Sequence, residues 1–170
     1  MMTTDTLTPV INLDDVELRD FADAEGRFSA RVGSFGKVIG SSGIGCMLHV
    51  VEPGRKAFPF HAHHRIHEVF VVLEGEGVYR FGDERYPIRT GDVCAAPTGG
   101  ADTAHQIANT GTTMLKYLGL STTAETEVVE YPDSGKFAVS SRYDMSNPEA
   151  GGIRFVGRKE ASLDYFEGEP

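Results

Sequence analysis

Residues 61–75 of the chain read HAHHRIHEVFVVLEG, and this stretch contains four of the six histidines. Because side chains alternate between the two sides of a strand, we expect His61 and His63 to point the same way. Glu68 opens the apolar run that follows and shares a strand face with Phe70. Two imidazoles and a carboxylate brought together in this way could form most of a metal site.

A second segment downstream offers another candidate ligand. Residues 91–99 read GDVCAAPTG, which indicates a turn, a buried strand and a second turn. This segment leads to His105, which shares one strand face with Ile107 and Asn109. A closed β-fold could therefore bring His105 opposite the histidines of the first segment.

The chain as a whole has the pattern of an all-β protein. Short apolar segments alternate with turns rich in glycine and proline, which is typical of a sandwich or barrel. The expected strands are 44–51, 69–73, 78–81, 86–88, 92–96, 104–108, 113–120, 127–131, 137–140 and 153–156.

A hairpin is the simplest arrangement for the segments 67–73 and 77–82, with residues 74–77 as its turn. With a loop of either two or four residues, Tyr79 faces the same side as Phe70, which is inward if Glu68 is a ligand. A buried phenol needs a hydrogen-bond partner. That partner is either a ligand at the metal or a backbone carbonyl, and both alternatives stay open. We expect Tyr79 and Phe70 to line the ligand pocket.

Bulk composition limits the classes of function. The 170 residues are 40% hydrophobic and 24% charged, as in a soluble single domain. The net charge of -9 argues against a nucleic-acid or anionic-membrane partner. Cys46 and Cys94 are too few for a disulfide framework and read as buried small residues.

We expect a cytoplasmic protein, with an N-terminal arm (1–24), a barrel (25–141) and a C-terminal extension (142–170).

The first segment resembles the first motif of the cupin superfamily. That motif has a glycine, five residues, His-x-His, three or four residues, a glutamate, six residues and a glycine. Here the same order is given by Gly54, His61, His63, Glu68 and Gly75, with six residues after the first glycine. The extra residue falls in a turn, where insertions are tolerated.

The second segment resembles the second cupin motif, which has a glycine, five residues, Pro-x-Gly, two residues, a histidine, three residues and an asparagine. The matching positions are Gly91, Pro97, Gly99, His105 and Asn109, with five residues before the histidine. This departure also falls in a turn. From the residues alone, we expect Asn109 to hold a loop through hydrogen bonds to the backbone.

The resemblance implies a double-stranded β-helix, or jelly-roll, barrel with arms at both ends. The chain is similar to single-domain cupins without an assigned function, some of which are named sugar-phosphate isomerases. By matching the motifs, the resemblance also implies that one divalent transition-metal ion (Fe, Mn, Zn or Ni) lies inside the barrel. Its ligands would be His61, His63, Glu68 and His105.

Function beyond metal binding is left open between three classes, since one fold hosts many chemistries. The first is a metal-dependent enzyme on a small organic or sugar-like ligand, isomerase-like or dioxygenase-like, with no catalytic residue identified. The second is a non-catalytic small-molecule-binding module, and the third has a structural metal. Open coordination positions favour the first over the third. We also expect a homodimer.

Other polar residues near the first segment have two interpretations each. His64 and His67 break the alternation of their neighbours, so we expect them to lie in a loop or to point outward. Arg55, Lys56 and Arg65 flank the site in sequence and could bind an anion, or they could be solvated loop charges.

Overall fold

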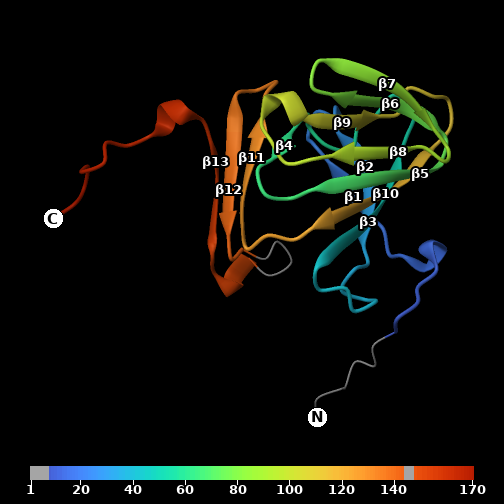
Figure 1. Cartoon of the computed structure of the whole chain (residues 1–170), viewed down its shortest axis with the longest axis horizontal. Helices are drawn as coiled ribbons and strands as arrows, with labels where there is room; N and C mark the ends of the chain where they lie inside the picture. Colours follow the sequence, from blue (N-terminus) through green and yellow to red (C-terminus); the bar gives the residue numbers. More distant parts are fainter. Residues whose placement is uncertain (1–7, 144–147) are drawn as a thin grey trace, which may run out of the picture.

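The structure is a computed structural model that describes residues 8–143 and 148–170. Within these residues the chain forms thirteen strands and four short 3-10 turns, with no α-helix (Figure 1). The all-β prediction is confirmed. None of the described helices is long or apolar enough to cross a membrane.

The strands follow one another along the whole described chain. They are β1 (Arg19–Ala22), β2 (Ser29–Ser34), β3 (Ile44–Val51), β4 (Ala62–His63), β5 (Glu68–Glu74), β6 (Glu76–Phe81), β7 (Glu84–Arg89), β8 (Val93–Ala96), β9 (His105–Ala108), β10 (Leu115–Thr122), β11 (Thr126–Tyr131), β12 (Lys136–Ser141) and β13 (Ile153–Gly157). The 3-10 turns are η1 (Leu13–Asp15), η2 (Ala101–Thr103), η3 (Pro148–Ala150) and η4 (Lys159–Ala161).

Two sheets enclose the core of the barrel. One has six strands in the order β1-β2-β3-β10-β5-β8, and the other has three in the order β7-β6-β9. The residues packed between them come from both sheets, and they include Phe70, Val72, Tyr79, Ile107 and Tyr117. This arrangement of facing antiparallel sheets is the expected jelly-roll.

The predicted hairpin between segments 67–73 and 77–82 is wrong. β5 pairs with β10 and β8, while β6 pairs with β7 and β9, so the two segments belong to different sheets. The chain changes sheet at Gly75, which has a φ of +83°. A Cβ at that position would lie 2.3 Å from the Met114 carbonyl oxygen, so a glycine is needed. Local sequence signals are the same for a hairpin turn and for such a corner.

β1 and β2 were not predicted, and β4 is shorter than the strand expected around His61 and His63. Each of the three has a weak local pattern. All four residues of β1 are exposed, β2 contains a glycine, and β4 is only two residues long. β4 exists because residues 62 and 63 pair with β11, far along the chain. Strand pairing of this kind depends on tertiary contacts rather than on propensity.

A third sheet, with the order β13-β12-β11-β4, lies beside the barrel and is called the C-terminal sheet here (Figure 1). β13, the strand expected at 153–156, pairs with β12 and forms one edge of this sheet. Beyond β13 the chain leads away from the body of the molecule (Figure 1). Because β4 is the other edge strand, the C-terminal sheet reaches His63 and the candidate metal ligands.

Asn109 has the structural role that we expected. Its side-chain amide donates to the carbonyls of Val51 and Thr113, both at 2.8 Å, and its oxygen accepts from the amide of Gly111 at 3.0 Å. The residue is fully buried, so these bonds have no competition from water. Cys46 and Cys94 are buried and free, also as expected.

Candidate metal centre

Backbone hydrogen bonds hold two of the candidate ligands side by side. The His61 amide donates to the His105 carbonyl at 3.1 Å, and the His105 amide donates to the His61 carbonyl at 2.8 Å. This reciprocal bridge joins the segment before β4 to the start of β9. Glu68 enters from a third direction, because it is the first residue of β5 and pairs with Ala96 of β8.

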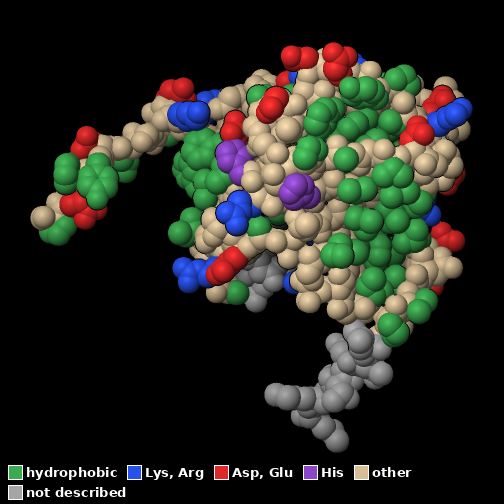
Figure 2. Space-filling view, viewed as in Figure 1, with side chains coloured by type: hydrophobic (Ala, Val, Ile, Leu, Met, Phe, Trp, Pro, Cys, Tyr) green, Lys and Arg blue, Asp and Glu red, His purple; other side chains and the backbone are tan. Residues whose placement is uncertain are grey.

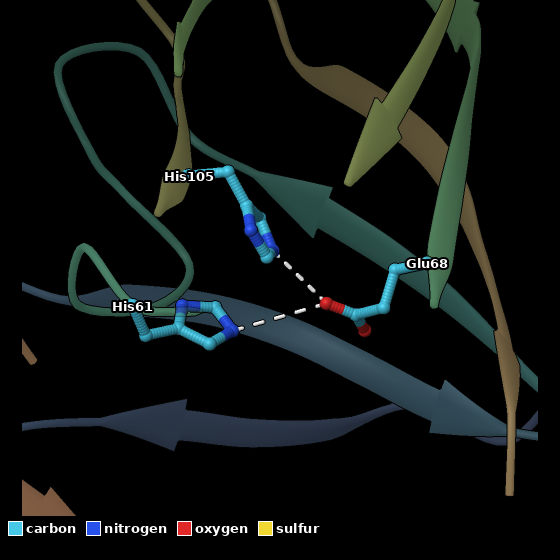
Figure 3. A group of neighbouring side chains, drawn as sticks. All are labelled: His61, Glu68 and His105. Atoms are coloured by element: carbon cyan, nitrogen blue, oxygen red, sulfur yellow. Dashed lines mark hydrogen bonds and ion pairs between the residues drawn. The ribbon is translucent and has the colours of Figure 1, made fainter. Parts of the chain in front are cut away.

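The side chains from these segments converge on one oxygen atom. Oε2 of Glu68 lies 2.9 Å from Nε2 of His105, 3.4 Å from Nε2 of His63 and 3.9 Å from Nε2 of His61. Figure 3 shows the rings of His61 and His105 directed at this carboxylate. One ligand atom from each of His61, Glu68 and His105 fits within 4.8 Å of the others, as a bound ion would require.

The ring nitrogens are arranged so that the inner ones can bind a metal. Nδ1 of His61 lies 2.8 Å from the Pro59 carbonyl, which accepts only from a protonated nitrogen. The proton is therefore on Nδ1, and Nε2 offers its lone pair toward Glu68. The donor set of imidazole nitrogens and one carboxylate suits a divalent transition-metal ion.

Burial sets the charge state of this cluster. Burial, followed by the neighbouring His105 and His63, lowers the pKa of His61 from 6.5 to about 4. Burial alone would raise the pKa of Glu68, but hydrogen bonds with His105 and His63 outweigh it and bring that pKa well below its usual range. At neutral pH, His61 is a neutral imidazole and Glu68 is an anion, and both are the forms that bind metals.

Glu127 of β11 was not predicted as part of the site. It is 5% exposed, and its Oε1 accepts from the amides of His64 at 2.9 Å and Arg65 at 3.2 Å. Its Oε2 faces Nδ1 of His63 at 4.0 Å. Among the described residues, neither of these two buried atoms has a hydrogen-bond partner. Carboxylates in this position orient metal-binding histidines through the nitrogen that does not bind the metal.

No sequence signal could have identified Glu127, because its role depends on which strand pairs with β4. In the register of the C-terminal sheet, His63 lies opposite Val129, so Glu127 is two residues away on the same face. The sequence alone does not specify that pairing.

The two residues expected to line the pocket lie inside the barrel next to His105. The ring centroid of Phe70 is 5.5 Å from that of His105, and the centroid of Tyr79 is 6.3 Å from it. The Tyr79 hydroxyl donates to the Ala95 carbonyl at 2.9 Å. Of the two partners considered for this phenol, the structure therefore has the backbone carbonyl. A role for either residue in ligand binding stays a prediction.

His49 of β3 is a further buried histidine near the site. Its ring stacks on Tyr117, with centroids 4.5 Å apart and planes inclined by 9°. Burial lowers its pKa to about 4, although the charge of Glu68 acts in the opposite direction. A Cβ at Gly119 would lie 2.8 Å from Cε1 of His49, so a glycine there leaves room for this ring. No motif or spacing in the sequence indicates a role for His49.

His64 and His67 are exposed and lie between β4 and β5, which confirms that they are loop residues. Nε2 of His64 contacts Oε1 of Glu130 at 2.7 Å, on the outside of the C-terminal sheet. The alternation of side chains thus separates the inner histidines from the outer ones, as predicted.

Comparison with known proteins gives one family match and several structural relatives. Residues 47–121 match a model of the cupin domain, Cupin_2. A 68-residue region is 35% identical to an oxalate-binding protein from Thermotoga maritima, covering 40% of this chain and 54% of that protein. The region thus spans about half the length of this relative.

Two solved structures resemble nearly the whole chain. A sugar phosphate isomerase of the cupin superfamily from Silicibacter pomeroyi has a TM-score of 0.72 and 27% identity, covering 92% of this chain and 98% of its own. A candidate sugar phosphate isomerase from Acidithiobacillus ferrooxidans has a TM-score of 0.77 and 23% identity, covering 92% and 96%. These matches confirm the cupin resemblance and the cupin fold.

Replacing Glu127 with glutamine tests its action on His63. We expect the affinity for a divalent metal to fall about 10-fold to 100-fold, as for other partners of metal-binding histidines. The amide group cannot reproduce the carboxylate that favours a proton on Nδ1 of His63. A chelator competition titration measures the metal affinity, and ¹⁵N NMR shows which ring nitrogen of His63 carries the proton. Glu130→Gln is the matched control, and equal affinities in both variants would contradict this role.

Acid should destabilise the metal-free protein. His49 and His61 have a folded-state pKa of about 4 against 6.5 for a free histidine. The unfolded chain therefore binds more protons, and stability is lost as pH falls below about 6.5. We expect urea denaturation to show a loss of about 1–2 kcal/mol per histidine between about pH 7 and pH 5. His49→Phe should flatten this profile, and a pH-independent unfolding free energy would rule out the explanation.

Proposed function

We propose that this chain, whose residues 47–121 form a cupin domain, binds one divalent transition-metal ion and acts as a metal-dependent enzyme. Its substrate would be a small organic or sugar-like molecule. The observation that carries this proposal is the convergence of histidine Nε2 atoms on one oxygen of Glu68 inside the barrel.

The proposed ligands are His61, His63, Glu68 and His105. The donor atoms of His61, Glu68 and His105 lie within 4.8 Å of one another, and Nε2 of His63 lies 3.4 Å from Oε2 of Glu68. The side chains of His63 and Glu68 are 16% and 20% exposed, so a small molecule can reach the centre. A structural metal site is usually closed by protein ligands, which favours the enzyme over that alternative.

Two reaction classes suit the site, isomerisation of a sugar-like substrate and oxidation by a dioxygenase-like reaction. The bound ion would supply Lewis acidity or, if redox-active, oxygen chemistry. The described residues around it would orient the ligand and exclude water. We assign this role to Phe70 and Tyr79, which lie beside His105. The similarity to the Silicibacter pomeroyi isomerase, at 27% identity, supports the first class.

A non-catalytic binding module is the second candidate function. The oxalate-binding protein from Thermotoga maritima, 35% identical over 68 residues, supports it. The same metal centre would then hold a small chelating molecule without converting it. The two candidates differ in whether a bound ligand is released unchanged.

The proposed partners are the small-molecule ligand and a second copy of the chain, with no nucleic acid or membrane, in the cytoplasm. The argument for a homodimer is apolar surface at the C-terminal end. β13 is an edge strand with Phe155 45% exposed, and Tyr165 and Phe166 beyond it are 86% and 74% exposed. Exposed edges and aromatic side chains of this kind are usually covered in an assembly.

Removing single ligands tests the metal centre. His105→Ala should lose most of the bound metal, and Glu68→Ala should weaken binding far more than His67→Ala, because His67 is exposed outside the site. Metal content is measured on protein purified without a histidine tag, before and after anaerobic reconstitution. Full occupancy in His105→Ala would remove His105 from the ligand set. Equal losses in the other two variants would argue against Glu68.

Light scattering tests the homodimer. At micromolar concentration we expect twice the chain mass of 18.5 kDa. A variant that lacks residues 163–170 should dissociate more readily, because it loses exposed aromatic side chains. A monomeric mass for the full chain would contradict the proposal.

A further inference from the structure

One face of the C-terminal sheet continues outward from the metal centre. Directly paired residues in antiparallel strands point to the same side. His63 pairs with Val129, and two residues further along β11 Tyr131 pairs with Lys136 of β12. Ser140, on the same face of β12, pairs with Arg154 of β13. The face that presents His63 to the metal therefore also carries Tyr131, Lys136 and Arg154. These residues lie beyond 47–121, the part that matches the cupin model.

Tyr131 connects the metal centre to the two cations. Its ring centroid is 6.3 Å from that of His61, and Nζ of Lys136 lies 5.4 Å from the Tyr131 ring centroid. Arg154 lies on the same face, opposite Ser140, which is four residues along β12 from Lys136. Burial raises the pKa of Tyr131, while the positive charge of Arg154 acts to lower it. The ring of Tyr131 is thus a neighbour of both His61 and Lys136.

Within residues 8–143 and 148–170, neither cation forms an ion pair with a carboxylate. Among the residues with described positions, no carboxylate oxygen lies within 4.0 Å of Lys136 or Arg154. Instead, both cations lie over aromatic rings. Lys136 lies over Tyr131, and Cζ of Arg154 lies 5.9 Å from the ring centroid of Tyr143. A cation on a ring face keeps N–H donors available for another partner.

The carboxylates of β11 are already occupied. Glu127 shares this face, but one of its oxygens accepts from backbone amides and the other faces His63. Glu130 points to the opposite face and contacts His64. In a chain of net charge -9, two uncompensated cations beside a candidate ligand site are unusual. Figure 2 shows that acidic, basic and hydrophobic side chains are interspersed over the face of the molecule in view.

We propose that Lys136 and Arg154 bind the anionic group of a ligand whose other end binds at the metal centre. The ligand would be an elongated molecule with oxygen donors at one end and a phosphomonoester or carboxylate at the other. A phosphate dianion matches two cations best. Tyr131 would line the path between the two ends. This assignment rests on the proposed metal centre for the position of the ligand, but the anion site consists of separate residues.

The cations that flank the first motif in sequence are less suitable. The Arg55 guanidinium donates to the carbonyl of Gly26, on the loop before β2. Lys56 forms backbone bridges to Phe28 and Ala108, which places it at the barrel edge. The anion site is therefore assigned to the C-terminal sheet rather than to these loop residues.

Calorimetric titration with ribose and with ribose 5-phosphate tests the assignment, because the two probes differ only in the phosphate. We expect the full-length protein to prefer the phosphate by about tenfold or more. In the double variant Lys136→Ala/Arg154→Ala the preference should fall to about twofold or less, with metal affinity unchanged. Glucose and glucuronate make the same comparison for a carboxylate and so identify which anion the site takes.

Arg89→Ala is the matched control, because Arg89 is an exposed cation on β7 in another sheet. It should keep the full preference. The anion site would be overturned if the double variant also kept the full preference for the anionic probe. It would equally be overturned if the unmodified protein preferred neither anionic probe over its neutral counterpart. Each titration is run on metal-free and metal-loaded protein. Failure of the metal centre would appear as absent metal binding, whereas failure of the anion site would appear as a lost preference in both forms.

Discussion

The reciprocal hydrogen bonds between the backbones of His61 and His105 are the constraint on which the site depends. They join segments 44 residues apart in sequence, and they fix the distance between two imidazole rings whose centroids lie 4.5 Å apart. Glu68 can then meet both rings because β5 lies in the opposing part of the barrel. A backbone bridge is well suited to this purpose, since it does not depend on side-chain rotamers and is stable inside a closed β-fold.

Convergence of these side chains has an electrostatic cost that the barrel compensates locally. Glu68 is mostly removed from water, and hydrogen bonds with His105 and His63 keep it ionised. The arrangement places the Glu68 carboxylate beside the neutral imidazole of His61 and close to His63 and His105, and such a cluster of ligand atoms suits a divalent cation. The same burial that keeps His61 neutral makes the cluster ready for a metal at neutral pH.

Three strands of the C-terminal sheet lie beyond residues 47–121, the part that matches the cupin model, and the sheet adjoins the candidate metal ligands. Through the pairing of β4 with β11 it brings Glu127 to the back of His63, and it carries Lys136 and Arg154 on the same face as His63. Metal affinity and the choice of ligand would thus be set by different residues of one sheet. A barrel of one common design can acquire a particular specificity in this way, because the added strands change the surroundings of the metal and leave its ligands intact.

The sequence by itself determined the all-β fold and the segments that carry the candidate ligands, because strand alternation and glycine-marked turns are local signals. It also determined that His61 and His63 share a side and that Asn109 holds a loop. Only the tertiary structure decided which strands pair. The change of sheet at Gly75 and the contact of Glu127 with His63 both depend on pairing between distant segments. A strand's own residues specify its faces but not its neighbour, since any strand offers the same backbone donors and acceptors.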